Sequence, residues 1–439
     1  MDTTPNRKRA QWGWYWFDFG NSAYAAVILL AVYSAYFQKS VVGGTEGTRL
    51  WGVALGAAML VVALVSPFLG AIADHSASKK KMLFVFSSLT WVFTSLLFFV
   101  ESGDVLTGML FFILAEIGYR GGQVFYNALL YDVANTEEMG RVSGNGWAFG
   151  SIGGIACLLF ILPAIVISKS DPLVVRSSFV FTAVFFILST LPLYLWVREG
   201  KQARAIPAGE NYFTLAFKRL GSTFRAVRHF REYLKFILSF LIYNDGILMA
   251  LNFAAIIGGV LFGMTQTQLI IFMIIVQVTS AIGAYVFGIW GEKFGFKRAL
   301  NWSLLLMIAA VIGMIFNPSL NGYFAIGALA GFALTGVQSL SRTMAGLFAP
   351  ESKSAEFFSF FAVAGKSSSF IGPTLYGVLA YSATQWFTQR GTDILLAEQY
   401  GQRASIAAIA IFLIVGYAAL NLVNEKVARK AALDYAAAD

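Results

Sequence analysis

Charged residues are scarce in this sequence. They make up 13% of its 439 residues, whereas hydrophobic residues make up 58%. Soluble domains usually carry about 25% charged residues. The mean hydropathy is +0.68, and a soluble fold of this length could not bury so much apolar surface. The composition therefore predicts a protein whose solvent is the lipid bilayer.

Metal-binding residues are almost absent as well. The chain has two His residues and one Cys, Cys157, which lies inside an apolar run. A single Cys excludes an intramolecular disulfide, and so few His and Cys residues cannot form a structural zinc cluster. We therefore expect neither a bound metal nor another cofactor.

The sequence also lacks the short motifs of several enzyme classes. It contains no His-Glu-x-x-His, no Gly-x-Ser-x-Gly and no Walker loop. These motifs are typical of zinc proteases, serine hydrolases and nucleotide-driven proteins. We expect a protein that is not an enzyme and is not driven by ATP.

What the sequence has instead is a series of long apolar runs. A spanning helix needs about 20 apolar residues, and about twelve runs fit this requirement. They cover residues 17–38, 51–73, 82–100, 106–131, 143–167, 177–197, 233–261, 268–290, 299–316, 322–348, 357–382 and 404–424. The pattern predicts an all-α polytopic membrane protein with twelve transmembrane helices.

Basic residues are distributed unevenly between the two sides. Twelve spans place both termini on one side, which carries 23 Lys and Arg residues against 6 on the other. Cytoplasmic loops are enriched in Lys and Arg, so both termini are expected in the cytoplasm. The same rule accounts for the net charge of +9 without a nucleic-acid partner. The short loops favour a bacterial inner (plasma) membrane.

One longer polar segment, residues 198–232, divides the chain near its middle. We expect a cytoplasmic N-terminus at 1–16, six-helix bundles at 17–197 and 233–424, and a cytoplasmic C-terminus at 425–439. Within the central segment, apolar residues recur at helical spacing between basic ones: Phe213, Phe217, Leu220, Phe224 and Val227. This spacing predicts a basic amphipathic helix on the inner leaflet, whose function is to tether the two halves.

Two loop segments have the same spacing. One begins at Gly70, with Asp74 four residues on and a basic pair at 79–80, and the other begins at Gly288, with Glu292 and a basic pair at 297–298. They lie 218 residues apart, about half the chain, as in transporters built from two related halves. Asp74 and Glu292 are predicted to belong to a cytoplasmic latch, and the alternative is an ordinary loop rich in positive charge.

These loops resemble the signature of the major facilitator superfamily, and further segments resemble its vacuole-effluxer branch, the autophagy-related amino-acid permeases and their bacterial relatives. The further segments are Trp16-Phe17-Asp18-Phe19-Gly20-Asn21-Ser22-Ala23-Tyr24, Tyr243-Asn244-Asp245-Gly246, Gln338-Ser339-Leu340-Ser341-Arg342, the stretch 356–361, Gly365-Lys366 and Gly372-Pro373. The resemblance covers nearly the whole chain, although His75, Ala77 and Ser78 depart from the loop signature.

The resemblance implies a major facilitator fold with two pseudo-symmetric six-helix halves. It also implies a carrier of small organic solutes that works by alternating access. The best-known members of the branch release neutral amino acids such as leucine, isoleucine and tyrosine from the yeast vacuole. Protons are the expected coupling ion, because no sodium site is recognisable in the sequence. We expect a monomer whose partners are the solute, membrane lipid and protons.

Several charged side chains lie inside the predicted spans. A charge at the centre of a span costs at least about 2.5–3.5 kcal/mol on insertion scales, so such residues are expected to face a cavity or a partner. They include Asp18, Glu116, Arg120, Asp245, Arg342 and Lys366. In the superfamily, spans one, four, seven and ten line the central cavity, and five of the six lie on those spans.

Glu116 and Arg120 lie one helical turn apart and are predicted to pair. The pair is either purely structural or part of the transport site. In a transport site, the guanidinium of Arg120 would bind a substrate carboxylate through two parallel hydrogen bonds. Glu116 would then be the group that takes up a proton.

Asp245 is the strongest single candidate for binding substrate or a proton, because it lies near the middle of span seven beside Asn244. Gly246 follows and would allow the helix to unwind there. A buried, hydrogen-bonded Asp is the alternative. Asp18 and Asn21 share one face of span one, where Asp18 either caps a helix N-terminus or belongs to a gate or cavity.

The remaining candidates lie on the later spans and on span four. Arg342 is predicted to close a cytoplasmic gate by pairing with Asp18 or Asp132. Lys366 would pair with Glu356 or extend toward the inner interface. Polar or aromatic residues that contact ligand, or that pack between helices, are Asn127, Gln338, Tyr126 and Tyr243.

A glycine stripe in span five, Gly146, Gly150 and Gly154, predicts close helix packing.

Two other functions compete with the carrier. One is a membrane receptor or scaffold that binds a small solute without moving it, and the other is an intramembrane enzyme.

Overall fold

A computed structural model of the chain consists of helices, and its described residues contain no strand. It describes residues 4–75, 78–135, 138–199, 221, 227–228, 230–350, 357, 360–365 and 369–438. The contacts between Cα atoms divide the chain into two compact units. The first contains Met1–Ala216 with Met264–Met273, and the second contains Phe217–Gly263 with Ile274–Asp439.

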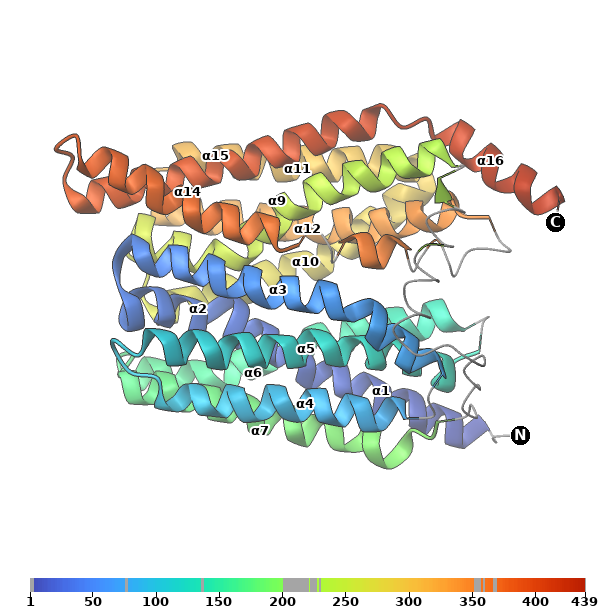
Figure 1. Cartoon of the computed structure of the whole chain (residues 1–439), viewed down its shortest axis with the longest axis horizontal. Helices are drawn as coiled ribbons and strands as arrows, with labels where there is room; N and C mark the ends of the chain where they lie inside the picture. Colours follow the sequence, from blue (N-terminus) through green and yellow to red (C-terminus); the bar gives the residue numbers. More distant parts are fainter. Residues whose placement is uncertain are drawn as a thin grey trace. The chain divides into compact units, whose positions relative to one another are not determined.

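The helices follow the predicted runs in order. Those of the first part of the chain are α1 (Thr4–Tyr24), η1 (Ala25–Ala31), α2 (Tyr33–Tyr36), η2 (Phe37–Val42), α3 (Gly44–His75), α4 (Lys79–Leu96), η3 (Leu97–Phe99), α5 (Val105–Val133), α6 (Met139–Ile167) and α7 (Pro172–Trp196). Those of the second part are α9 (Arg231–Phe262), α10 (Gln266–Phe294), α11 (Phe296–Phe316), α12 (Leu320–Leu347), α14 (Ile371–Thr388), α15 (Ile394–Asn421) and α16 (Glu425–Ala438) (Figure 1).

Eleven of the helical segments within the described residues are long and apolar enough to cross a membrane. The first of them, Asn6–Val42, joins α1, η1, α2 and η2 into one segment. The eleventh predicted run, 357–382, lies partly outside the described residues, and α14 covers its later portion. The predicted amphipathic helix of the central segment lies almost entirely outside them.

Local sequence explains where several helices begin. Asp171 caps α7, its side chain accepting a 2.8 Å hydrogen bond from the Leu173 N–H, and Pro172 takes the first helical position. Asp393 caps α15 in the same way, and Ser319 caps α12. Each cap satisfies a backbone donor that the first helical turn leaves free.

Both ends of the chain are more helical than expected. Helix α1 begins at Thr4, so most of the segment 1–16, expected as a cytoplasmic N-terminus, is helical and continuous with the apolar run that follows. The predicted C-terminal tail, 425–439, is the short helix α16. The basic residues near the N-terminus concealed this, because charge lowers hydropathy without lowering helix propensity.

Span one changes its hydrogen-bonding register twice. After Tyr24 the chain forms a π-helical segment, η1, in which Val32 N–H bonds Val27 O at 2.9 Å, and η2 is a second such segment. π-Helical segments are rare in proteins overall, and those that occur frequently lie at functional sites. They rotate the side chains that follow relative to an unbroken α-helix.

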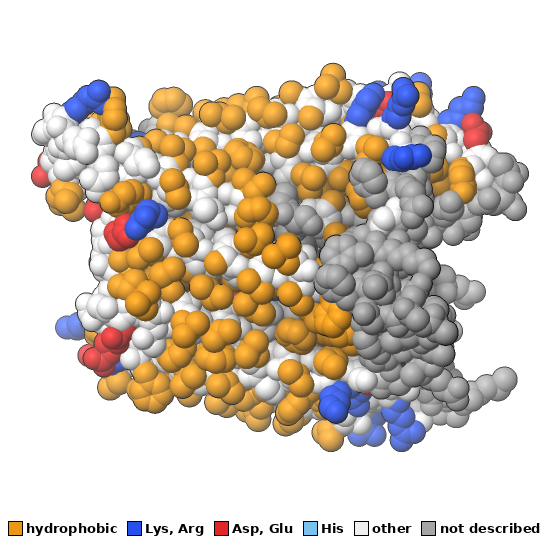
Figure 2. All heavy atoms as spheres, in the orientation of Figure 1, with side chains coloured by type: hydrophobic (Ala, Val, Ile, Leu, Met, Phe, Trp, Pro, Cys, Tyr) orange, Lys and Arg blue, Asp and Glu red, His pale blue; other side chains and the backbone are white. Residues whose placement is uncertain are grey.

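Within the first unit, α4 packs along α5 and α7, and α1 packs against α6 and α7 (Figure 1). Within the second, α15 packs along α9, α11 and α14. Hydrophobic side chains cover much of the surface over the middle of the helices (Figure 2). Among the exposed ones are Leu64 (71% exposed), Leu106 (83%) and Leu195 (75%). Outward-facing leucines of this number are expected where lipid is the solvent.

Candidate functional site

A charged pair lies inside the first unit on α5. Nε of Arg120 donates a 2.7 Å hydrogen bond to Oε1 of Glu116, as the spacing of four residues predicts. The side chain of Glu116 is fully buried, whereas that of Arg120 is 24% exposed. A solute that reaches the pair therefore contacts the guanidinium of Arg120 and not the carboxylate of Glu116.

Two tyrosines surround this pair. The rings of Tyr24 and Tyr119 lie 4.7 Å apart between centroids, and the Arg120 guanidinium lies over the Tyr119 ring at 5.3 Å. The Tyr24 hydroxyl is beside the Glu116 carboxylate. Neither that hydroxyl nor Oε2 of Glu116 completes a hydrogen bond with a described residue. Buried polar atoms of this kind are exceptional and often mark functional sites.

Asp18 lies deep inside α1. The helix begins at Thr4, so Asp18 is about four turns from its start, and the helix-capping interpretation is wrong. Its carboxylate is hydrogen-bonded by Asn21 and lies against Gly150 of α6. Asp18, Asn21 and Tyr24 recur every three residues and therefore share a side of α1.

The resulting group of side chains, here called the α1–α5 cluster, contains Asp18, Asn21, Tyr24, Glu116, Tyr119 and Arg120. Sequence reasoning found four of its members and missed Tyr24 and Tyr119. Tyr24 could have been found from the three-residue spacing of Asp18, Asn21 and Tyr24. Tyr119 gave no signal beyond its position next to Arg120.

Tyr126 and Asn127 follow on α5 but differ in their surroundings. The Tyr126 ring stacks on Trp14 at 4.4 Å and on Phe17 at 4.8 Å, and its backbone carbonyl accepts a bond from the Trp14 indole. Tyr126 thus packs between helices, one of the two roles considered for it. Asn127 is exposed.

In the second unit, α9 carries Tyr243, Asn244 and Asp245. The hydroxyls of Tyr243 and Ser341 lie 2.6 Å apart, joining α9 to α12. Asp245 is buried, with 3% of its surface exposed, and Asn244 is partly exposed. The helix runs without a break through Gly246, so the expected unwinding is wrong. Gly246 instead lies against Leu413 and Phe412 of α15, where a side chain would prevent close packing.

Gln338 and Arg342 lie one turn apart on α12, and both are exposed. Asp132, one partner considered for Arg342, is bonded to Lys79 within the first unit at 2.7 Å. Lys366 and its considered partner Glu356 lie outside the described residues.

The first of the two repeated loops leads into a set of bonds between helix ends. Nζ of Lys80 donates to the carbonyls of Tyr194 and Val197 at 2.9 and 2.6 Å, at the end of α7. The carboxylate of Glu199 accepts from the backbone N–H groups of Lys79 and Lys80 at 3.0 and 2.8 Å. A cation at a helix C-terminus and an anion at a helix N-terminus are both favourable.

The second loop ends in a similar arrangement. Nζ of Lys297, at the start of α11, donates to the carbonyls of Val423 and Asn421 at 2.5 and 3.4 Å, where α15 ends. The repeat aligns Lys297 with Lys79 and not with Lys80, but Lys80 and Lys297 are each the second residue of their helix and each bonds the end of another helix of its own unit. Glu292 is exposed at the end of α10, and the side chain of Asp74 lies outside the described residues.

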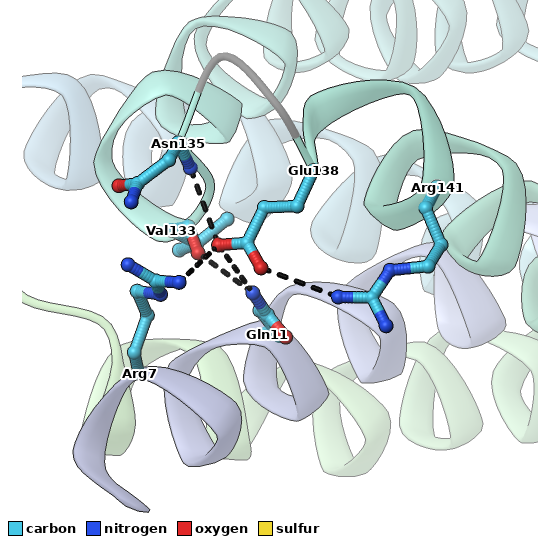
Figure 3. Close-up of polar contacts among 6 residues, drawn as sticks. All are labelled: Arg7, Gln11, Val133, Asn135, Glu138 and Arg141. Atoms are coloured by element: carbon cyan, nitrogen blue, oxygen red, sulfur yellow. Dashed lines mark hydrogen bonds and ion pairs between the residues drawn. The ribbon is translucent and has the colours of Figure 1, made fainter. Parts of the chain in front are cut away.

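A third polar group joins α1 to the segment between α5 and α6 (Figure 3). Glu138 accepts bonds from Arg7 at 2.8 Å, from Gln11 at 3.3 Å and from Arg141 at 3.3 Å. The Asn135 N–H also donates to it at 3.3 Å. This backbone hydrogen bond is the main cause that lowers the pKa of Glu138 below its ordinary value of 4.5, and the arginines add to it. Among the described residues, no three His, Cys, Asp or Glu side chains are grouped as metal ligands.

Solved structures show which fold this is. A bacterial homologue of the human lysosomal transporter Spinster, inward-facing and unoccupied, matches with a TM-score of 0.75 at 17% identity, over 98% of this chain and 99% of that one. The nucleoside transporter NupG matches with a TM-score of 0.70 at 12% identity, over 95% and 99%. The chain therefore has the fold of these transporters, and eleven candidate membrane-spanning segments lie within its described residues.

The sequence defines the family more closely. The family model described as "Vacuole effluxer Atg22 like" matches residues 53–433, and the chain belongs to this family. An uncharacterized MFS-type transporter of Bacillus subtilis, YxiO, is 28% identical over 84% of this chain and 87% of its own length. Autophagy-related protein 22-1 of Aspergillus niger is 22% identical over 54% of this chain. That match spans 42% of the length of the fungal protein. The protein is an integral membrane transporter of the major facilitator type.

Proposed function

We propose that this transporter is a proton-coupled carrier of small organic solutes that bear a carboxylate, with neutral amino acids as the first class. One observation carries the proposal. In the Glu116–Arg120 pair the anion is fully buried and the cation is partly accessible, so an incoming carboxylate meets the guanidinium first. A guanidinium binds a carboxylate through two parallel hydrogen bonds.

Charge balance assigns the other roles in the α1–α5 cluster. When a substrate carboxylate bonds Arg120, Glu116 loses its partner, and an unpaired buried carboxylate is strongly unfavourable. Uptake of one proton by Glu116 removes that charge. Asp18 and Asn21 supply acceptors for the ammonium group of an amino acid, so both charges of the substrate have partners within one unit.

The second unit contributes the other part of the proposed machinery. Asp245, with Asn244 beside it, binds substrate or a proton, and Tyr243 and Gln338 are further candidate ligand contacts, as is Asn127 on α5 of the first unit. The proposed gates contain Arg342, Lys366, Asp74 and Glu292, together with Asp18 and Asn21. The tests of these roles are direct, because each is a single side chain.

The experiment is uptake of radiolabelled leucine, isoleucine and tyrosine by proteoliposomes, with and without a pH gradient. The proposal expects saturable uptake that a pH gradient drives. It expects Arg120→Lys, which keeps the charge but loses the paired hydrogen bonds, to raise KM by about 10-fold or more. Arg176→Lys is the matched control, because Arg176 forms an ion pair with Glu101 outside the cluster.

The outcomes separate the alternatives. A solute that binds without any flux would identify a receptor or scaffold instead of a carrier. Saturable flux that does not depend on the pH gradient would contradict proton coupling and would still support a carrier. Chemical change of the solute would indicate an enzyme.

The proposed cellular setting is a bacterial inner membrane with both termini in the cytoplasm. The excess of Lys and Arg on the terminal side supports it. Cysteine labelling from outside intact cells tests it, with the native Cys157 replaced and single cysteines placed at Ser170 and at Ala436. The expected result is labelling at Ser170 alone, and labelling at Ala436 from outside would reverse the orientation.

A further inference from the structure

A cavity in the first unit is distinct from the α1–α5 cluster. It has a volume of about 560 Å³ and lies at the end of the unit that contains the start of α1 and the ends of α5 and α7. Its lining residues are Asn6, Arg7, Arg9, Ala10, Asp132, Asn135, Leu195, Trp196 and Arg198. Polar side chains thus form most of its wall.

The charge of this cavity is predominantly positive. Three of its lining residues are arginines, and the one carboxylate among them, Asp132, is only 1% exposed and already bonded to Lys79 at 2.7 Å. Arg7 is bonded to Glu138 at 2.8 Å. Arg9 lies over the Trp196 ring at 5.0 Å, which orients its guanidinium without neutralising it. Arg198 makes no ion pair with a described residue.

The position of the cavity indicates what kind of anion it would meet. Leu195, in its wall, is 75% exposed, and exposed leucines at the end of a spanning helix face acyl chains. Trp196 follows, and tryptophan is enriched at the level of lipid headgroups. The cavity therefore has a cationic part next to an apolar part, the combination that a headgroup phosphate and its acyl chains require.

We propose that this cavity binds a phosphate group through Arg9 and Arg198, from the headgroup of an anionic phospholipid or from soluble phosphate. Arginine is well suited to phosphate, because its planar donors match two phosphate oxygens. Basic pockets at the cytoplasmic ends of spanning helices are a known means of lipid recognition in membrane proteins. The site is separate from solute transport, so it stands whether or not the carrier proposal holds.

The test is native mass spectrometry of the purified full-length protein with phosphatidylglycerol, and with phosphatidylcholine as the zwitterionic comparison. Soluble inorganic phosphate is tested separately by its effect on thermal stability. The test variant is the double change Arg9→Gln and Arg198→Gln. The matched control is Lys8→Gln and Lys81→Gln, which removes the same charge from exposed positions outside the cavity.

The proposal expects saturable binding of phosphatidylglycerol that the test variant weakens by about 10-fold or more and the control leaves nearly unchanged. The same dependence on the two arginines with inorganic phosphate, and not with the lipid, would assign the site to soluble phosphate. Equal weakening in both double variants would show a general effect of surface charge and overturn the proposal. Absence of saturable binding of either probe would also overturn it.

Discussion

In the ion pair between Glu116 and Arg120, the carboxylate is buried and the guanidinium is accessible. The carboxylate has no exposed surface, the guanidinium is 24% exposed, and the bond between them is 2.7 Å long. The accessible guanidinium keeps contact with solvent, whereas the buried carboxylate depends on its partner for stabilisation. The accessible cation is what allows an exchange of partners to be proposed for this site.

Changing Arg120 should separate stability from transport. Arg120→Ala leaves Glu116 charged, buried and unpaired, so we expect a loss of about 3–5 kcal/mol in stability together with loss of uptake. Combining it with Glu116→Gln removes the stranded charge and should restore most of the stability, with uptake still absent. Thermal denaturation and proteoliposome uptake measure the two effects. Uptake at the normal rate in the double variant would contradict the proposed site.

Asp245 provides the corresponding test in the second unit. Asp245→Asn keeps the size and most hydrogen-bonding capacity of this buried side chain, so we expect normal insertion and uptake lowered by at least about 100-fold. The control is Ser239→Ala on the same helix, where a buried hydroxyl bonds the Gly416 carbonyl at 2.8 Å. Removing that bond should cost about 1 kcal/mol of stability and leave uptake intact. Equal effects of the two changes on uptake would mean that Asp245 has only a structural role.

The sequence predicted the spans well and the polar contacts only in part. Hydropathy located the eleven spanning segments found within the described residues, because lipid imposes the same length and composition on each. It failed at Asp18, whose depth in α1 depends on basic residues that are helical without being apolar. It also failed at Gly246, because a glycine that permits unwinding and one that permits close packing look identical in sequence.

Contacts across helices were the least predictable part. The pairing of Glu116 with Arg120 follows from a spacing of four, but the proximity of Tyr24 depends on how α1 lies along α5. The bonds from Lys80 and Lys297 to distant helix ends were likewise not foreseen. The 218-residue repeat aligns Lys297 with Lys79 and not with Lys80, so it did not identify these contacts.

The glycines of α6 should differ sharply in their tolerance of a side chain. A Cβ at Gly153 would overlap the backbone carbonyl of Phe19, whereas a Cβ at Gly144 would meet no atom within 4 Å. We expect Gly153→Ala to destabilise the protein by about 1–3 kcal/mol by separating α6 from α1. Gly144→Ala, in the same helix, should be neutral or stabilising by up to about 1 kcal/mol. Thermal unfolding in detergent distinguishes them, and equal midpoints would contradict the close approach.

Lys80 and Lys297, each the second residue of its helix, should make similar contributions to their own units. Lys80→Met strands the Tyr194 and Val197 carbonyls at the end of α7, and Lys297→Met strands those of Asn421 and Val423 beyond α15. We expect each to cost about 1–2 kcal/mol, whereas Lys81→Met, at an exposed position, should cost little. Limited proteolysis, with fragments assigned to each unit, would show which unit each substitution destabilises. If Lys81→Met were as costly as the other two, general loss of positive charge would explain all three.

Glu138 should make the stability of the first unit dependent on acid. The Asn135 N–H, and then Arg7, Gln11 and Arg141, hold its pKa below the ordinary value of 4.5 (Figure 3). A group whose pKa is lower in the folded state stabilises that state above its unfolded pKa, and the contribution disappears as the pH falls through the folded value. The difference in thermal midpoint between the wild type and Glu138→Gln should therefore be constant above pH ~5 and shrink below 4.5. Arg7→Gln should reduce this difference more than Arg141→Gln, because Arg7 makes the shorter bond, 2.8 against 3.3 Å. A difference that stayed the same at every pH would show that the contacts of Glu138 do not depend on its charge.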